Sequence, residues 1–213
     1  DNGRVQKFND EGEYLAQFDG SEAPPGALVE PCGIDIGPNG HIWVADARYG
    51  RVEEFSASGE YLQEVHGASR YGSGPAEFGS PRGLAVGEDG HVWVVDRSNH
   101  RVQELSSTGE YLDEFGTEGE GNGQFDSAES IEVTPEGDVV VGDYRRVQTF
   151  DDEGNYLMHF GSPGWFHYVT GIAAAPDGDL VVSGFQDDQV ETWIHPGPPE
   201  ATTGFSLCWA TRT

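Results

Sequence analysis

Aspartate and arginine recur together in this 213-residue chain, and they could form charge-assisted hydrogen bonds. Each aspartate ends a short apolar segment, and each arginine begins the next segment a few residues later. A carboxylate in this position can accept hydrogen bonds from the intervening loop and pair with the arginine. A catalytic group is normally needed once, so a pair present in several copies is interpreted as structural. The pairs are Asp46 with Arg51, Asp96 with Arg101, and Asp143 with Arg146.

Histidines and acidic turns are the residues that could hold a metal ion. Zinc needs three or four converging ligands, and of the seven histidines only His167 is expected in a linker where several repeats could meet. His41 and His91 share one repeat position and are expected on the opposite face. Segments 9–12 and 151–154 resemble parts of a calcium loop but lack its full ligand spacing. We predict no cofactor, with calcium or zinc as alternatives.

Cys32 and Cys208 are the only cysteines, and neither belongs to a CxxC motif that would suggest zinc or redox chemistry. The sequence leaves open whether they pair with each other. It contains no nucleophile elbow, HExxH motif or phosphate-binding glycine loop. The glycine-rich stretches 67–74 and 116–123 are expected to be linkers.

The elements that must position these residues form a repeat. Arg-Val pairs occur at 4–5, 51–52, 101–102 and 146–147, and a weaker copy, Gln-Val, occurs at 189–190, so the period is 43 to 50 residues. Each unit contains four short apolar runs separated by turns with Asn-Gly, Asp-Gly or Glu-Gly, which predicts a four-stranded meander. Such a meander at this period predicts an all-β fold, a β-propeller of four-stranded antiparallel blades.

The strand count predicts an incomplete ring. We expect a propeller at 1–195, with blade segments at about 1–18, 31–66, 81–116, 128–161 and 169–195, and a tail at 196–213 that could add one strand. Naming the strands of a blade a to d, the order is c-d, three complete units, then a-b-c, which makes 17 strands or about four and a half blades. No segment supplies strands a and b of the first blade. Since the chain begins within a repeat, we expect the missing strands or adjoining domains in flanking sequence.

The chain is strongly acidic, with 38 acidic and 11 basic residues and a net charge of −27. Such a surface repels phosphate, which argues against a nucleic-acid partner and an anionic membrane. No apolar run is long enough to span a bilayer, so we expect no membrane insertion. The acidity has two interpretations, a solvated surface or a surface for cationic partners, and the scatter of acids over the turns favours the first.

Several spaced elements resemble the NHL repeat: 81–86, 89–96, 99–103 and the link 116–125. Copies of these elements extend from Asp1 to about Ile194. NHL propellers usually have six blades, so the resemblance implies a truncated six-bladed ring. It also implies a binding scaffold, because most members bind proteins or other ligands. A minority of related propellers are enzymes, namely the zinc-dependent peptidyl-amidoglycolate lyases and the streptogramin lyases.

The positions at which the copies differ are the candidate binding site. Strand a begins with a chemically different residue in each blade, at the position that faces the mouth of the central channel in a propeller, and such groups make a plausible polar site. The loops between strands b and c add further side chains to this face, and His167 could approach it from a linker. The alternative is that these loop sequences drift without selection. The candidates are Cys32, Arg82, Glu129, Thr170, Arg48, Arg97, Tyr144 and His167.

These observations support three hypotheses about function. The first is a non-enzymatic scaffold that presents this face to a protein, peptide or glycan ligand. The second is a metal-dependent lyase or lactonase-like hydrolase with its site at the channel. The third is a structural module of a larger envelope protein. Resemblance to bacterial members of the family favours an extracytoplasmic location, although the sequence itself does not identify the compartment.

Overall fold

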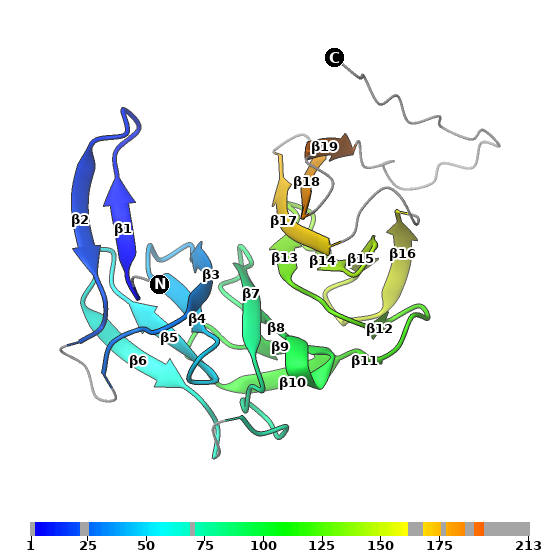
Figure 1. Ribbon diagram of the computed structural model, residues 1–213, viewed down its shortest axis with the longest axis horizontal. Helices are drawn as coiled ribbons and strands as arrows, with labels where there is room; N and C mark the ends of the chain where they lie inside the picture. Colours follow the sequence, from blue (N-terminus) through cyan, green and yellow to red (C-terminus); the bar gives the residue numbers. More distant parts are fainter. Residues whose placement is uncertain are drawn as a thin grey trace.

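The computed structural model describes residues 3–21, 26–68, 71–161, 168–175, 178–185 and 190–193. Most of their strands form antiparallel sheets that follow one another around an arc (Figure 1). Their one helical element is the single 3-10 turn η1 (Arg97–Asn99), and they include no helix that could cross a membrane. The all-β prediction is therefore confirmed.

Three sheets are complete four-stranded meanders, each with its first strand towards the middle of the arc and its fourth strand outside (Figure 1). Tight turns join the first two strands of each sheet. In these turns Gly40, Gly90 and Gly137 have φ values of 79°, 87° and 95°, which other residues rarely adopt.

The first sheet contains β3 (Pro31–Ile36), β4 (Ile42–Asp46), β5 (Arg51–Phe55) and β6 (Tyr61–Val65). The second contains β7 (Pro81–Val86), β8 (Val92–Asp96), β9 (Arg101–Leu105) and β10 (Tyr111–Phe115). The third contains β13 (Ser130–Val133), β14 (Val139–Asp143), β15 (Arg146–Phe150) and β16 (Tyr156–Phe160).

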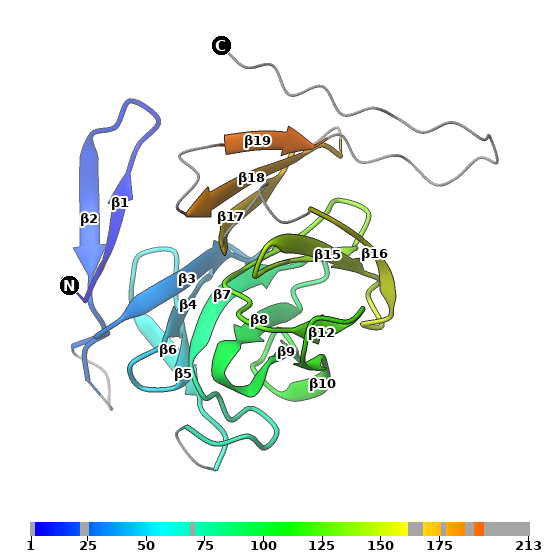
Figure 2. The same ribbon diagram turned by 45° about the vertical axis from the view of Figure 1, so that its right-hand side comes forward.

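The sheets at the two ends of the arc have fewer strands among the described residues. The hairpin of β1 (Val5–Phe8) and β2 (Tyr14–Phe18) corresponds to strands c and d. The last sheet contains β17 (Tyr168–Ala174), β18 (Leu180–Phe185) and β19 (Val190–Trp193), which correspond to a, b and c. Figures 1 and 2 both show the β1–β2 hairpin standing clear of β17–β19. The arc is therefore open within the described part of the chain, and the tail at 196–213 with Cys208 lies outside that part.

One predicted linker contains secondary structure. The stretch after β10 forms two short parallel strands, β11 (Thr117–Glu118) and β12 (Gln124–Phe125). The reason is Phe125, which is fully buried between the second and third sheets, while the Gly121 amide donates to Gln124 Oε1 at 2.8 Å. The stretch 116–123 thus joins the second and third sheets and contains β11 in addition.

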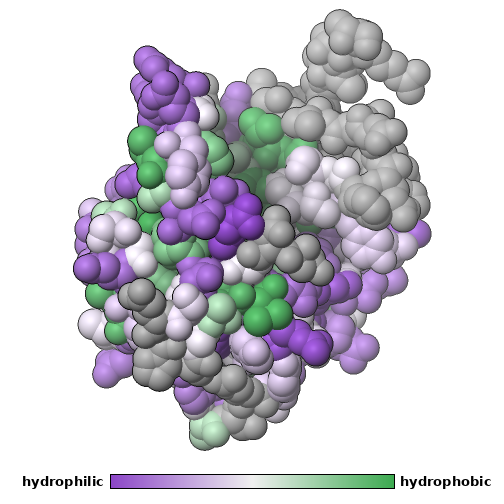
Figure 3. Space-filling model, turned by 60° about the vertical axis from the view of Figure 1, so that its left-hand side comes forward, coloured by the Kyte–Doolittle hydropathy of each residue, from purple (hydrophilic) through white to green (hydrophobic). Residues whose placement is uncertain are grey.

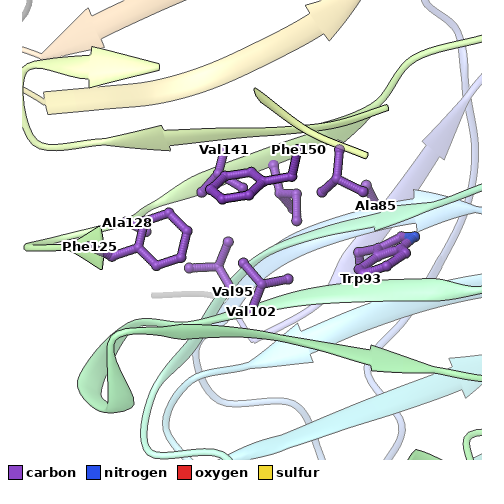
Figure 4. Packing of buried hydrophobic residues seen from close by; sticks show 10 residues of the cluster. Ala85, Trp93, Val95, Val102, Phe125, Ala128, Val141 and Phe150 are labelled. Carbon is purple, nitrogen blue, oxygen red and sulfur yellow. The ribbon is translucent and has the colours of Figure 1, made fainter. Parts of the chain in front are cut away.

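Apolar side chains between consecutive sheets form the core. Every residue of β4, β8 and β14 is buried, as expected for a strand covered on both faces. Figure 4 shows Trp93 and Val95 of β8 close to Phe150 and Val141 of the next sheet. Burial of each large side chain contributes roughly 1.5–3 kcal/mol, so packing between neighbouring sheets stabilises the arc.

A buried aspartate at the end of each second strand holds the linker that precedes the sheet. Asp46 accepts from the Glu30 amide at 3.0 Å, and Asp143 accepts from the Ser127 amide at 2.8 Å. Asp96 likewise accepts from the Gly79 amide at 2.8 Å. We expected the following b–c loop to supply the hydrogen bonds, but this loop contributes less, for example the Arg48 amide at 3.2 Å from Asp46.

The partner arginines bind the same linkers. Arg101 lies 3.1 Å from Asp96 and donates to the carbonyls of Ser73, Gly74 and Glu77. The equivalent distances are 3.3 Å for Arg51–Asp46 and 3.4 Å for Arg146–Asp143. Each Asp–Arg pair therefore fixes a linker at several points and sets where the next inner strand begins.

Glycines allow the inner strands to approach closely. A Cβ on Gly83 in β7 would lie 2.9 Å from the backbone nitrogen of Ile131 and 2.9 Å from Cα of Ser130 in β13. A Cβ on Gly33 in β3 would lie closer still to the backbone of β7, 2.7 Å from the backbone nitrogen of Leu84. The spacing of β3, β7 and β13 around the middle of the arc thus depends on these two glycines.

We predict that Gly83→Ala destabilises the protein by about 1–3 kcal/mol, because the new Cβ must push two backbones apart. Gly171→Ala is the matched control: it occupies the same repeat position, but its Cβ would meet only the rotatable Ser183 hydroxyl. Urea unfolding of both variants measures the difference. Equal stability of the two variants would contradict this account of strand spacing.

Candidate functional site

The start of β7 places Arg82 among polar side chains from two neighbouring sheets. Its Nη1 donates to Cys32 Sγ and to Glu30 Oε1, both at 3.2 Å. Its Nε lies 3.9 Å from Glu129 Oε2, which belongs to the residue just before β13. Arg82 therefore links the starts of three successive inner strands, β3, β7 and β13.

Arg97, in the 3-10 turn after β8, extends the cluster. Its Nη1 lies 3.0 Å from Glu129 Oε1, and its Nε and Nη2 donate to Ser127 Oγ at 3.1 and 2.9 Å. Glu129 thus lies between two guanidinium groups. We call this set the rim cluster: Glu30, Cys32, Arg82, Arg97, Ser127 and Glu129.

Four of the eight predicted site residues meet in the rim cluster, namely Cys32, Arg82, Glu129 and Arg97. Thr170 instead contacts its own sheet, where its hydroxyl donates to the Ser183 carbonyl at 3.5 Å.

The other predicted residues lie elsewhere. Arg48 is exposed, and its carbonyl accepts from the Tyr71 hydroxyl. Tyr144 packs on Tyr168, with ring centroids 5.0 Å apart, and lines a separate pocket with Arg145 and His159. His167 lies outside the described residues. The structure therefore divides the predicted site and assembles only its central part.

Sequence reasoning missed Glu30 and Ser127. Both occupy the repeat position two residues before the predicted ones, and the amide of each binds the buried aspartate of its sheet. That shared position is the signal that could have found them. At this position the first copy has Glu30, whereas the second and third copies have Ser80 and Ser127.

Cys32 contributes a thiol. Burial beside neighbouring strands raises the pKa of Cys32 more than the adjacent Arg82 guanidinium lowers it. The group is therefore protonated at neutral pH and acts as a hydrogen-bond partner, because nucleophilic attack needs the thiolate.

Two carboxyl groups lie further along the inner strands. Asp35 in β3 and Glu132 in β13 share one repeat position, with Ala85 of β7 between them. Asp35 Oδ2 accepts from the Val86 amide at 2.7 Å. Burial, followed by the charge of Asp35, raises the pKa of Glu132 to about 7. Sequence analysis did not single out either residue, although the alternation of acid and alanine at this position was visible.

The other face of the arc carries His–Glu pairs. His41 lies 2.7 Å from Glu54, and His91 lies 2.6 Å from Glu104 beside an acidic hollow. Within the described part of the chain, no three His, Cys, Asp or Glu side chains are grouped so that they could hold a metal ion.

Comparison with known sequences supports the repeat assignment. The sequence model of the NHL repeat matches residues 78–105, which include β7, β8 and β9. The resemblance to NHL repeats is therefore confirmed for this unit. No curated protein sequence matches the chain.

Solved structures support the fold. Virginiamycin B lyase from Staphylococcus aureus superposes with a TM-score of 0.63 at 15% identity, over 94% of this chain and 64% of that one. A protein of unknown function from Bacteroides caccae gives 0.63 at 15% identity, over 88% and 66% of the two chains. The WD40 β-propeller domain of Doa1 gives 0.62 at 17% identity, over 92% and 62%. The chain thus spans less than two thirds of each of these structures, and its β-propeller fold is confirmed.

We predict that Glu132→Gln stabilises the protein at pH 8 by about 1 kcal/mol, after allowance for solvent screening, and has little effect at pH 4. The folded-state pKa is raised above the ordinary value of 4.5, so stability is lost as pH rises through about 7. Glu88→Gln, an exposed turn residue, controls for the general loss of negative charge. Urea unfolding at both pH values measures the effect, and an equal gain at pH 4 and pH 8 would refute it.

Proposed function

We propose that this protein is a binding protein and that the rim cluster is where it takes a polypeptide ligand. The β-propeller fold suits such a role, because its inner rim gathers side chains from several sheets. The rim cluster supplies guanidinium donors and carboxylate acceptors that alternate across three sheets. This pattern can hydrogen-bond both the carbonyls and the amides of a peptide and can pair with its charged side chains.

One observation carries the proposal. Arg82 Nε is buried and has no hydrogen-bond partner among the described residues, although Nη1 of the same guanidinium donates to Glu30 and Cys32. A buried unsatisfied donor costs about 1–3 kcal/mol. Glu129 Oε2 lies 3.9 Å away, too far for a hydrogen bond, so a ligand carbonyl or carboxylate that draws the partly exposed guanidinium outward could satisfy Arg82 Nε.

The composition adds a second argument. The chain has 11 basic residues against 38 acidic ones, yet two arginines converge on Glu129. Neither arginine belongs to the repeated Asp–Arg pairs, so the scaffold does not account for them. Their partial exposure leaves both available to a ligand.

The residue types in the rim cluster favour binding over the enzymatic alternative. Virginiamycin B lyase and the WD40 domain share the fold at 15% and 17% identity, so the fold fits either role. The rim cluster, however, consists of paired arginines and glutamates and a protonated thiol. These groups can bind and orient polar ligands, and both glutamates of the cluster are paired with arginine.

The double variant Arg82→Ala/Glu129→Ala tests the proposal on arrays of peptides of defined sequence. We expect bound peptides to lose at least tenfold in affinity, because both charged groups of the site are removed. His41→Ala/His91→Ala, on the other face of the arc, should leave binding unchanged, and thermal melting checks that each variant is folded. Peptides bound equally well by the double variant would place the site elsewhere. If the wild-type chain bound glycans and no peptides, and the double variant lost that binding, the ligand of the rim cluster would be a glycan and not a polypeptide.

A further inference from the structure

The third sheet departs from the repeat beside its repeated arginine. In the first two sheets this arginine forms an ion pair with a glutamate of the fourth strand. Arg51 pairs with Glu64 at 3.4 Å, and the pair in the second sheet is Arg101 with Glu114 at 2.6 Å. In β16 the same repeat position holds His159. The third sheet therefore has an imidazole where the other two sheets have a carboxylate.

The loop between the second and third strands is also different in this sheet. Four residues form that loop in the first two sheets, but only Tyr144 and Arg145 separate β14 from β15. Arg145 has a φ of 66°, in the left-handed region that residues with a side chain seldom adopt. Its guanidinium lies over the Tyr144 ring, 4.4 Å from the ring centroid. It forms no ion pair or hydrogen bond within the described part of the chain, so its charge is available to a ligand.

Both changes border a hollow of about 200 Å³, which Arg145, Arg146 and His159 line together. Arg146 Nη1 donates one hydrogen to the Glu120 carbonyl at 2.5 Å and keeps a second. His159 Nδ1 lies 2.5 Å from the Tyr156 hydroxyl. When that hydroxyl donates, the neutral imidazole carries its hydrogen on Nε2, which can then donate to a ligand. The hollow thus offers two guanidinium groups and an imidazole to one oxyanion.

Carboxylates line the same hollow. Asp143 is already paired with Arg146 at 3.4 Å. Glu120 and Asp126, which lie in the linker before β13, also line the hollow. Among the described residues, neither of these two side chains forms an ion pair, with Arg145 or with any other cation. Charges of both signs therefore border one small space without neutralising each other, which suits a ligand that carries both charges itself.

The charge of the whole chain argues against a simple anion as the ligand. Hydrophilic residues are spread over the face shown in Figure 3, and acidic residues outnumber basic ones by 38 to 11. The resulting field repels a free carboxylate or phosphate but not a zwitterion, whose net charge is zero. The hollow is also smaller than the roughly 300–1,000 Å³ of pockets for larger organic ligands, so its ligand is small.

We propose that this hollow, lined by Glu120, Asp126, Arg145, Arg146 and His159, binds a free α-amino acid. The carboxylate of the amino acid accepts hydrogen bonds from the two arginines and the histidine, and so replaces the glutamate that the other two sheets have at this position. The ammonium group pairs with Glu120 and Asp126. None of these residues belongs to the rim cluster, so the proposal does not depend on peptide binding there.

An NMR titration of the full chain with a panel of amino acids from glycine to L-leucine tests the proposal. We expect saturable shifts at the amides of Tyr144, Arg145 and Gly161, which line the hollow. For L-alanine the matched probes are propionate, which lacks the ammonium group, and ethylamine, which lacks the carboxylate. Both should bind at least tenfold more weakly. No saturable shift with any amino acid, or equal affinities for L-alanine and propionate, would overturn the proposal.

His159→Glu is the sharpest variant, because it restores the residue of the other two sheets and so preserves the fold. The new carboxylate pairs with Arg146 and repels that of the ligand, so we expect at least a tenfold loss of affinity with no fall in melting temperature. Arg145→Asn, which tolerates a positive φ, should cause a similar loss. Arg48→Asn, in the corresponding loop of the first sheet, is the matched control and should bind normally. Full affinity in either of the first two variants would overturn the proposal.

The double variant Glu120→Gln/Asp126→Asn tests the ammonium contact by itself. We expect it to weaken the binding of L-alanine at least fivefold and not to weaken that of propionate, which has no ammonium group to lose. The same loss for both ligands would overturn the assignment of a zwitterion.

Discussion

The buried carboxylate at the end of each second strand is the constraint on which the rest of the structure depends. Asp46, Asp96 and Asp143 each bind the amides of the linker that leads into their own sheet. The inner strand begins one to three residues after the bound amide, so the same contact fixes where each rim residue lies. The buried carboxylate, the linker and the residue at the start of the inner strand thus form one unit that recurs around the arc. The arginine that pairs with each aspartate donates to carbonyls of the same linker.

This arrangement separates the scaffold from the site. The repeated residues hold the backbone in a nearly constant geometry, and Gly33 and Gly83 bring the inner strands within van der Waals contact. Side chains that differ between copies can then meet across sheets, as Cys32, Arg82 and Glu129 do.

Much of the fold follows from the sequence, because turn chemistry and strand pattern agree in every copy. Strands a to d, their order and the Asp–Arg pairs were predictable from spacing. The short strands β11 and β12 were not, because they depend on burial of Phe125 between two sheets.

For the site, the spacing of the repeats placed four residues on one rim but could not say which of their side chains would touch. Arginine reaches a neighbouring strand, whereas the short side chain of Thr170 reaches only its own sheet. Glu132 was missed because its altered pKa arises from burial and from Asp35, which is distant in sequence.

Amide hydrogen exchange tests the central role of the aspartates most directly. The amides of Glu30, Gly79 and Ser127 lie in linkers, outside any strand, but each binds a buried carboxylate. The account predicts protection close to that of the amides in β4, β8 and β14. It also predicts that Asp96→Asn accelerates exchange at Gly79 while Glu30 and Ser127 stay protected. Exchange of all three at the rate of exposed turns in the unaltered protein would contradict it.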